Sequence, residues 1–173
     1  MRPIFGFLAL VAAGCLAATA VVAQTKFTAA VACRKADPQH VLAVGDRPEH
    51  SLTVYQQQCA WTKPIEIGAD QYPDGVSTAM AQISGNKMQV HGFHVATLQS
   101  GDKATASFQM MQTLSKDGGL TEGKGSSAYT AGTGKLKGIK GKGTVTCAPA
   151  ADGGAQVTVP FPFMPLSLPV PAV

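Results

Sequence analysis

The sequence predicts an all-β protein: a small antiparallel β-barrel of about eight strands that follows an N-terminal signal peptide. Turn signals recur about every 10–15 residues between runs rich in Val, Phe and Thr, which is typical of an antiparallel barrel or sandwich. Outside the N-terminal segment, no long stretch has the 3.6-residue period of an amphipathic helix. With 45% hydrophobic and 14% charged residues, the chain does not have the composition of a highly charged disordered protein.

The N-terminal segment has the pattern of a secretory signal peptide. Arg2 precedes an uncharged, largely apolar stretch, and Val21-Val22-Ala23 places small residues at the −3 and −1 positions of a cleavage site. We expect cleavage after Ala23, with Gln24 as the new N-terminus; cleavage after Ala20 is the alternative. An uncleaved anchor is a further alternative, because the stretch is long enough to span a membrane. After cleavage we expect no stable membrane span.

The signal peptide predicts export to the periplasm or the extracellular space. Ala12-Ala13-Gly14-Cys15 resembles the lipobox of bacterial lipoproteins, so a lipoprotein acylated at Cys15 is the alternative. No Leu precedes these small residues and the apolar segment continues past Cys15, which favours an ordinary signal peptide.

Export places the chain where disulfides persist. Three cysteines follow the signal peptide, so one bridge and one spare thiol are expected. Cys33–Cys59, which closes a loop of about 26 residues, is the bridge we predict; Cys59–Cys147 is the competing pairing. None of the three has the Cys-x-x-Cys spacing of a zinc or redox site, and we predict neither a metal nor a cofactor.

Four segments are predicted: a signal peptide (1–23), an N-terminal extension or loop (24–50), the barrel domain (51–159) and a Pro-rich tail (160–173). The last strand is expected to end at Pro160, because proline has no N–H to donate to a sheet. The tail beyond it should be polyproline-like or disordered. The strands are expected, in chain order, at 41–44, 51–61, 76–84, 88–99, 104–114, 120–130, 135–139, 143–148 and 157–159.

The most distinctive stretch is Gly132-Thr133-Gly134-Lys135-Leu136-Lys137-Gly138-Ile139-Lys140-Gly141-Lys142-Gly143. Its glycines can adopt positive φ in a turn and allow strands to approach closely. In a strand–turn–strand, the lysines would point outward, with Leu136 and Ile139 as the inward residues. We assign a structural role to Gly132, Gly134, Lys135, Gly138, Gly141 and Gly143. A nucleotide-binding P-loop is not expected, since Leu136 stands where that motif needs Ser or Thr.

This stretch resembles a segment of the allene oxide cyclase and dirigent-protein barrels. It is closer still to a segment of uncharacterised bacterial secreted proteins with such a domain, in which a tryptophan-bearing strand and a Gly-Asp hairpin precede it. Trp61, Gly101-Asp102 and Gly132–Gly143 occur here in that order. The resemblance covers about residues 30–150. It implies the barrel fold and a homo-oligomer, but no catalytic carboxylate or pocket residue of the plant cyclases can be placed on this chain.

Two functions from different classes remain open. One is non-catalytic binding of a small apolar ligand or a partner surface, because small barrels can hold one ligand among their inward side chains. The other is an isomerase or cyclase acting on an apolar substrate in the lumen, with Glu122, Tyr129 and His91 as candidate catalytic residues. The side chains proposed to line the lumen are Met80, Met88, Phe93, Phe108, Met110 and Met111.

Other site types are disfavoured by the sequence. His91 and His94 are three residues apart, so on a strand they point to opposite faces and do not form a metal clamp. The formal net charge of +4, which becomes +3 without Arg2, is too small to argue for nucleic acid as a partner.

Overall fold

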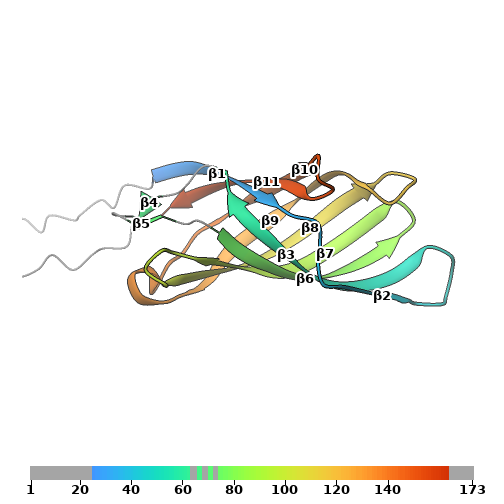
Figure 1. Cartoon of the computed structure of the whole chain (residues 1–173), viewed down its shortest axis with the longest axis horizontal. Helices are drawn as coiled ribbons and strands as arrows, with labels where there is room; N and C mark the ends of the chain where they lie inside the picture. Colours follow the sequence, from blue (N-terminus) through green and yellow to red (C-terminus); the bar gives the residue numbers. More distant parts are fainter. Residues whose placement is uncertain (1–24, 63–65, 68–69, 72–73, 164–173) are drawn as a thin grey trace, which may run out of the picture.

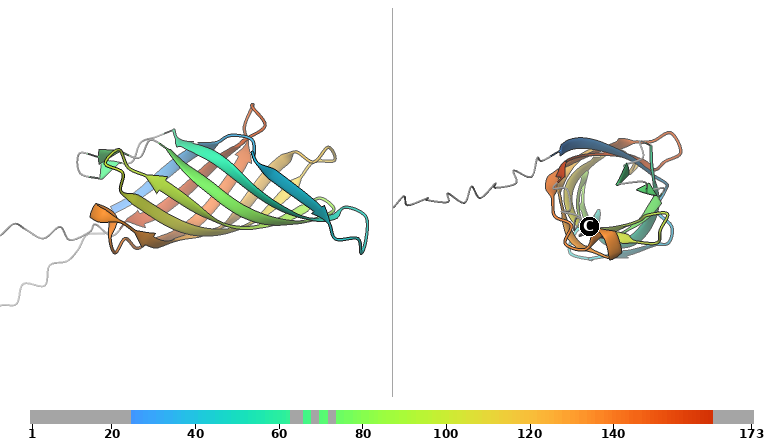
Figure 2. Two further views of the ribbon diagram at one scale, coloured as in Figure 1. Left: turned by 60° about the horizontal axis from the view of Figure 1, so that its bottom comes forward. Right: turned by 90° about the vertical axis from the view of Figure 1, so that its left-hand side faces the viewer.

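Eight strands close into one antiparallel β-barrel, which confirms the predicted fold class (Figures 1 and 2). The computed structural model describes residues 25–62, 66–67, 70–71 and 74–163; the predicted signal peptide, with Cys15, lies outside them. The strands are β1 (Thr25–Cys33), β2 (Gln39–Ala43), β3 (His50–Trp61), β4 (Glu66–Ile67), β5 (Asp70–Gln71), β6 (Asp74–Ser84), β7 (Lys87–Thr97), β8 (Lys103–Leu114), β9 (Leu120–Gly132), β10 (Lys142–Pro149) and β11 (Ala155–Phe163). No helix in this part of the chain is long and apolar enough to cross a membrane.

The barrel is a meander whose first and last strands meet. From β6 to β11 each strand pairs with its neighbour in sequence; β1 pairs with β11 on one side and with β3 on the other. The turns between β6 and β7, β7 and β8, and β8 and β9 fall where the sequence predicts them, and Gly85, Gly101 and Gly118 have positive φ there. The strands β2 and β4–β5 lie outside the closed circuit; β2 extends the sheet beside the first half of β3.

The contact that closes the circuit is short. Only three residue pairs join β1 to β3: Val31 with Trp61, Ala32 with Ala60, and Cys33 with Cys59. The last pair is a disulfide, as predicted, whereas Cys147 is a free, buried thiol. We call these three pairs the seam. The disulfide therefore reinforces covalently the place where strand pairing is shortest.

The barrel extends beyond both predicted boundaries. The segment 24–50, predicted as an extension or loop, contains strand β1, which is part of the barrel wall. The last strand does not end at Pro160 but continues to Phe163, paired with β1. Prolines are tolerated there because β10 pairs with β11 only as far as Thr158. By strand alternation, Pro160 and Pro162 turn their nitrogen toward the side that β10 does not reach. The rest of the predicted tail, 164–173, lies outside the described residues.

Inward and outward residues alternate, and the inward ones on β6 and β7 are mostly small. On β6 these are Gly75, Ser77, Ala79 and Ala81, while the neighbouring Met80 is 50% exposed on the outer surface. Large side chains from other strands occupy the space that the small ones leave. One consequence is visible at Gly92, where an added Cβ would lie 2.7 Å from the ring of Phe108 on β8.

The loop between β9 and β10 lies at the rim of one end of the barrel and packs against its inner residues there (Figure 2, orange). Leu136 is fully buried and Ile139 is 4% exposed; both pack on Ala96, Leu98 and Ala104. These two residues do point inward, as the sequence predicts, but the predicted strand at 135–139 is wrong. Residues Gly134–Leu136 form a 3₁₀ turn instead, so that two apolar side chains spaced three apart reach the core together. We call residues 133–141 the plug loop.

Asp102 fixes the plug loop to the hairpin between β7 and β8. Its carboxylate accepts a hydrogen bond from the backbone N–H of Lys135 at 3.0 Å, and the hydroxyl of Thr133 accepts one from the N–H of Lys103 at 2.8 Å. A Cβ on Gly134 would overlap the Asp102 carboxylate. Two separate motifs of the sequence, Gly101-Asp102 and Gly132–Lys135, therefore form one structural unit.

Removing the disulfide should weaken the closure of the barrel. A 26-residue loop corresponds to about 3 kcal/mol of stabilisation on the chain-entropy model, so the double variant Cys33→Ser/Cys59→Ser should lose about that much free energy of unfolding. Urea unfolding with and without dithiothreitol measures it. The reductant should destabilise the wild type and leave the double variant unchanged; an equal response of both proteins would contradict the assignment.

Gly134→Ala should be more destabilising than Gly138→Ala. Both glycines have positive φ, at 48° and 81°, so both variants carry the backbone strain of an L-residue there. Only the Gly134 variant also displaces the Asp102 carboxylate, because nothing lies within 4 Å of a Cβ at Gly138. We expect losses of about 3 and about 1 kcal/mol, measured by urea unfolding. Equal losses would show that the Asp102 contact does not stabilise the plug loop.

Candidate functional site

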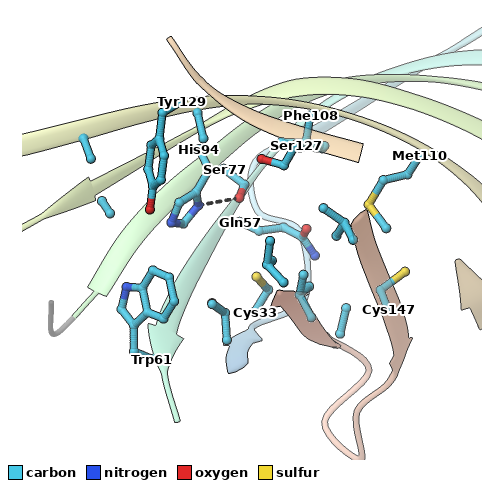
Figure 3. Close-up of a pocket in the computed structure, with 18 of the residues that line it drawn as sticks. Cys33, Gln57, Trp61, Ser77, His94, Phe108, Met110, Ser127, Tyr129 and Cys147 are labelled. Carbon is cyan, nitrogen blue, oxygen red and sulfur yellow. Dashed lines mark hydrogen bonds between the residues drawn. The ribbon is translucent and has the colours of Figure 1, made fainter. Parts of the chain in front are cut away.

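The lumen contains a cavity of about 100 Å³ (Figure 3). Every one of the eight barrel strands contributes side chains to its wall, and the wall is mainly apolar. Val31 and Cys33 of the seam belong to it, so the cavity exists only while the barrel is closed. The polar side chains in its wall are Tyr55, Gln57, Ser77, His94, Gln112, Ser127 and Tyr129.

His94 is the polar group that distinguishes this cavity. Its Nδ1 lies 2.9 Å from the hydroxyl of Ser77 on the neighbouring strand, and its ring meets Trp61 edge to face with centroids 6.5 Å apart. Figure 3 shows Trp61, His94 and Tyr129 on the same side of the cavity. The other ring nitrogen, Nε2, is buried and has no hydrogen-bond partner among the described residues.

The position of the His94 ring depends on a glycine. A Cβ at Gly75 would lie 2.6 Å from Nε2 and 2.7 Å from Cε1, so only glycine leaves room for the imidazole above β6. Burial lowers the pKa of His94 from its ordinary 6.5 to about 4. The imidazole is therefore neutral at pH 7. Depending on the tautomer, its Nε2 can donate a hydrogen bond to a molecule in the cavity or accept one from it.

The remaining titratable groups in the wall are also neutral at pH 7. Burial raises the pKa of Tyr55 and of Tyr129 to about 12, and that of the Cys147 thiol to about 11. Gln112 lies 3.5 Å from the Cys147 sulfur. A thiol with a raised pKa is a poor nucleophile, so Cys147 serves as a packing residue rather than as a reactive group.

The six proposed lumen residues divide between the two faces of the barrel wall. Phe108 and Met110 line the cavity, and Met88 is partly buried against the same core. Met80, Phe93 and Met111 lie on the outer surface, with 50%, 55% and 52% of their area exposed. The error has a physical cause: in a narrow barrel the inward positions next to bulky residues must be small, so size rather than hydrophobicity marks the inner face.

The candidate catalytic residues are separated in the same way. Tyr129 lines the cavity, whereas Glu122 on β9 and His91 on β7 are exposed on the outer surface. As expected from their spacing, His91 and His94 point to opposite faces of β7. Sequence reasoning identified neither His94 nor Ser77 as site residues. On β7, Val90, Gly92, His94 and Ala96 share one face, but Phe93 and Val95 on the other face are apolar too, so alternation alone gave no clear signal for His94.

Outside the lumen, one cluster of titratable residues stands out among the described residues. Asp46 lies 2.7 Å from Arg47 and 2.5 Å from Nδ1 of His50, and the hydrogen bond from His50 lowers its pKa. Gln82 contacts the other ring nitrogen of His50. These side chains tie the loop before β3 to β6 and do not line the lumen cavity. No group of three or more His, Cys, Asp or Glu side chains in the described chain could hold a metal ion.

Comparison with known proteins assigns no family. No protein-family model matches the chain, and no curated protein matches its sequence. A barrel fold by itself does not indicate a function, because one fold hosts many unrelated chemistries. Any functional conclusion therefore has to come from the cavity itself.

Burial of neutral His94 predicts a loss of stability in acid. On acidification, His94 binds a proton below about pH 6.5 in the unfolded chain, but only near pH 4 in the folded chain. As far as this group is concerned, the free energy of unfolding is therefore highest above pH 6.5 and falls by about 3 kcal/mol as the pH drops to about 4. Urea unfolding across this range should show a flatter pH dependence for His94→Gln than for the wild type.

The matched control for this measurement is His91→Gln, which changes an exposed histidine on the same strand. It should keep the pH dependence of the wild type. If His94→Gln keeps it too, the imidazole is not buried in a neutral form.

Proposed function

We propose that this protein is an exported binding protein whose barrel lumen holds a small, largely apolar ligand beside His94. One observation carries the proposal: a mainly apolar cavity of about 100 Å³ inside the barrel whose wall includes a buried ring nitrogen without a partner in the described chain. Ligand sites are typically apolar cavities with a few fixed polar groups that orient the ligand. An unpartnered buried nitrogen costs about 1–3 kcal/mol, which a bound molecule recovers.

The proposed export rests on the signal-peptide pattern and agrees with the disulfide. The Cys33–Cys59 bridge is compatible with an oxidising compartment, where such bonds persist. The periplasm and the extracellular space both fit, and a lipoprotein anchored at Cys15 is the alternative.

Kinship with the allene oxide cyclase and dirigent-like barrels is part of this proposal. The closed eight-stranded barrel supports it, and so does the contact of Asp102 with the segment Gly132–Lys135, since these are two of the motifs on which the resemblance rests. The homo-oligomer that this kinship implies stays a prediction.

The isomerase or cyclase alternative has less support. Of its three candidate residues only Tyr129 lies at the cavity, and that phenol is neutral at pH 7 because burial raises its pKa to about 12. None of the side chains that line the cavity is a carboxylate. We therefore favour binding over catalysis.

Xenon provides a direct test, because it occupies apolar cavities without requiring a hydrogen bond. Titration with xenon, followed by NMR of the lumen methyl groups, should shift the signals of Val145, Val157 and Met110 and leave those of the exposed Met80 unchanged. The filled-lumen variant Ala106→Leu should lose this response while keeping its fold, at a cost of about 1–3 kcal/mol. A wild type whose lumen signals do not respond would contradict the proposed function.

A further inference from the structure

The hydrogen-bonding groups around the cavity show what kind of ligand would fit it. Gln57 donates to the carbonyl of Arg34 at 3.0 Å, and the hydroxyl of Ser127 donates to the carbonyl of Ser107 at 3.0 Å. The amide group of Gln57 and the hydroxyl hydrogen of Ser127 are therefore already used in hydrogen bonds to the backbone. Nε2 of His94, which also belongs to the cavity wall, is buried and has no hydrogen-bond partner in the described part of the chain.

This nitrogen is held in place before any ligand arrives. The hydroxyl of Ser77 binds Nδ1 on one side of the ring, and Trp61 contacts the ring edge. Gly75 lies directly beneath it, so the ring cannot move closer to β6. A fixed hydrogen-bonding group loses little conformational freedom on binding, which favours affinity for a ligand with a matching polar atom.

The wall selects against charged ligands. None of the residues that line the cavity is Lys, Arg, Asp or Glu, and His94 is neutral because burial lowers its pKa to about 4. A carboxylate or an ammonium group would leave water without finding an opposite charge, which is strongly unfavourable. The occupant must therefore be neutral.

The cavity also limits the size of the ligand. A cavity of about 150 Å³ holds benzene, which has six non-hydrogen atoms. In proportion, about 100 Å³ accommodates about four non-hydrogen atoms. The ligand, or the part of it that enters the lumen, is therefore short.

The polar atom of the ligand must suit either tautomer of His94. If Ser77 donates its proton to Nδ1, Nε2 carries a hydrogen and needs an acceptor. If Nδ1 donates instead, the Ser77 hydroxyl can turn its hydrogen toward the disulfide sulfur of Cys59, 3.6 Å away, and Nε2 needs a donor. A hydroxyl group serves both cases, because it donates and accepts.

We propose that the lumen binds a small neutral alcohol of about four non-hydrogen atoms, whose hydroxyl forms a hydrogen bond with Nε2 of His94. This inference rests on the proposed function, since it names the chemical class of the ligand for the same cavity. The hydrogen bond to His94 makes the cavity selective for alcohols over apolar molecules of the same size, which an apolar cavity alone would not be.

The test uses three probes with four non-hydrogen atoms each: 1-propanol, 1-chloropropane and n-propylammonium. Each is titrated into the full mature protein and followed by NMR of the lumen methyl groups and of the His94 ring nitrogens. In the wild type, 1-propanol should shift the Nε2 resonance and 1-chloropropane should not. No saturable lumen shift is expected with n-propylammonium.

The decisive comparison is between variants, because the two neutral probes differ in their own hydrophobicity. His94→Leu should weaken 1-propanol binding about ten-fold relative to 1-chloropropane binding. His91→Leu, on the outer face of the same strand, should leave the ratio of the 1-propanol affinity to the 1-chloropropane affinity unchanged. Ser77→Ala, which removes the partner of Nδ1 but keeps Nε2, should change the ratio several-fold and provides a second variant should His94→Leu fail to fold.

The outcomes separate the two proposals. An unchanged ratio in both His94→Leu and Ser77→Ala, an unmoved Nε2 resonance, or saturable binding of n-propylammonium in the lumen would each overturn the alcohol proposal. If xenon and 1-chloropropane still bind in the lumen, the proposed function survives that result. If none of the probes, xenon included, reaches the lumen of the wild type, the proposed function itself is wrong.

Discussion

The interior of this protein depends on the seam between β1 and β3. Three residue pairs and one disulfide turn an open sheet into a closed wall. Closure removes water from the lumen, and that removal is the cause of the lowered pKa of His94 and the raised pKa values of the lumen tyrosines. The disulfide is also part of this wall, since Cys33 lines the cavity. The stability of the barrel and the chemistry of its cavity therefore have the same origin.

The cavity itself follows from an uneven distribution of side-chain size. Small inward residues on β6, such as Ser77 and Ala79, face a lumen that Phe108, Met110 and Trp61 enter from other strands. The large residues do not fill all of the space that the small ones leave. At one end of the barrel, Leu136 and Ile139 of the plug loop pack on Ala96 and Ala104, two residues of the cavity wall. The result is a short, mainly apolar chamber in which Nε2 of His94 is held in a fixed position.

Much of the fold could be predicted from the sequence, because turns and strand periodicity are local properties. The barrel and the hairpin turns were accessible in this way, whereas Cys33–Cys59 was the preferred one of two pairings that the sequence left open. The plug loop was not, since Leu136 and Ile139 fit a strand as well as a 3₁₀ turn until Asp102 is placed beside Lys135. The inner face of β7 was missed because Phe93 is more hydrophobic than His94, yet Phe93 lies outside. Which face of a strand points inward depends on what the opposite wall contributes, and that is a tertiary property.

The pairing of β1 with β11 also determines when the barrel can close during folding. Nine consecutive residue pairs join Thr25–Cys33 to Ala155–Phe163, at opposite ends of the described chain. Contacts so distant in sequence cannot form until the last strand is present, whereas the hairpins from β6 to β10 join neighbouring strands and can form earlier. Before that moment β1 lacks its longest partner, and its unpaired edge is available to other chains.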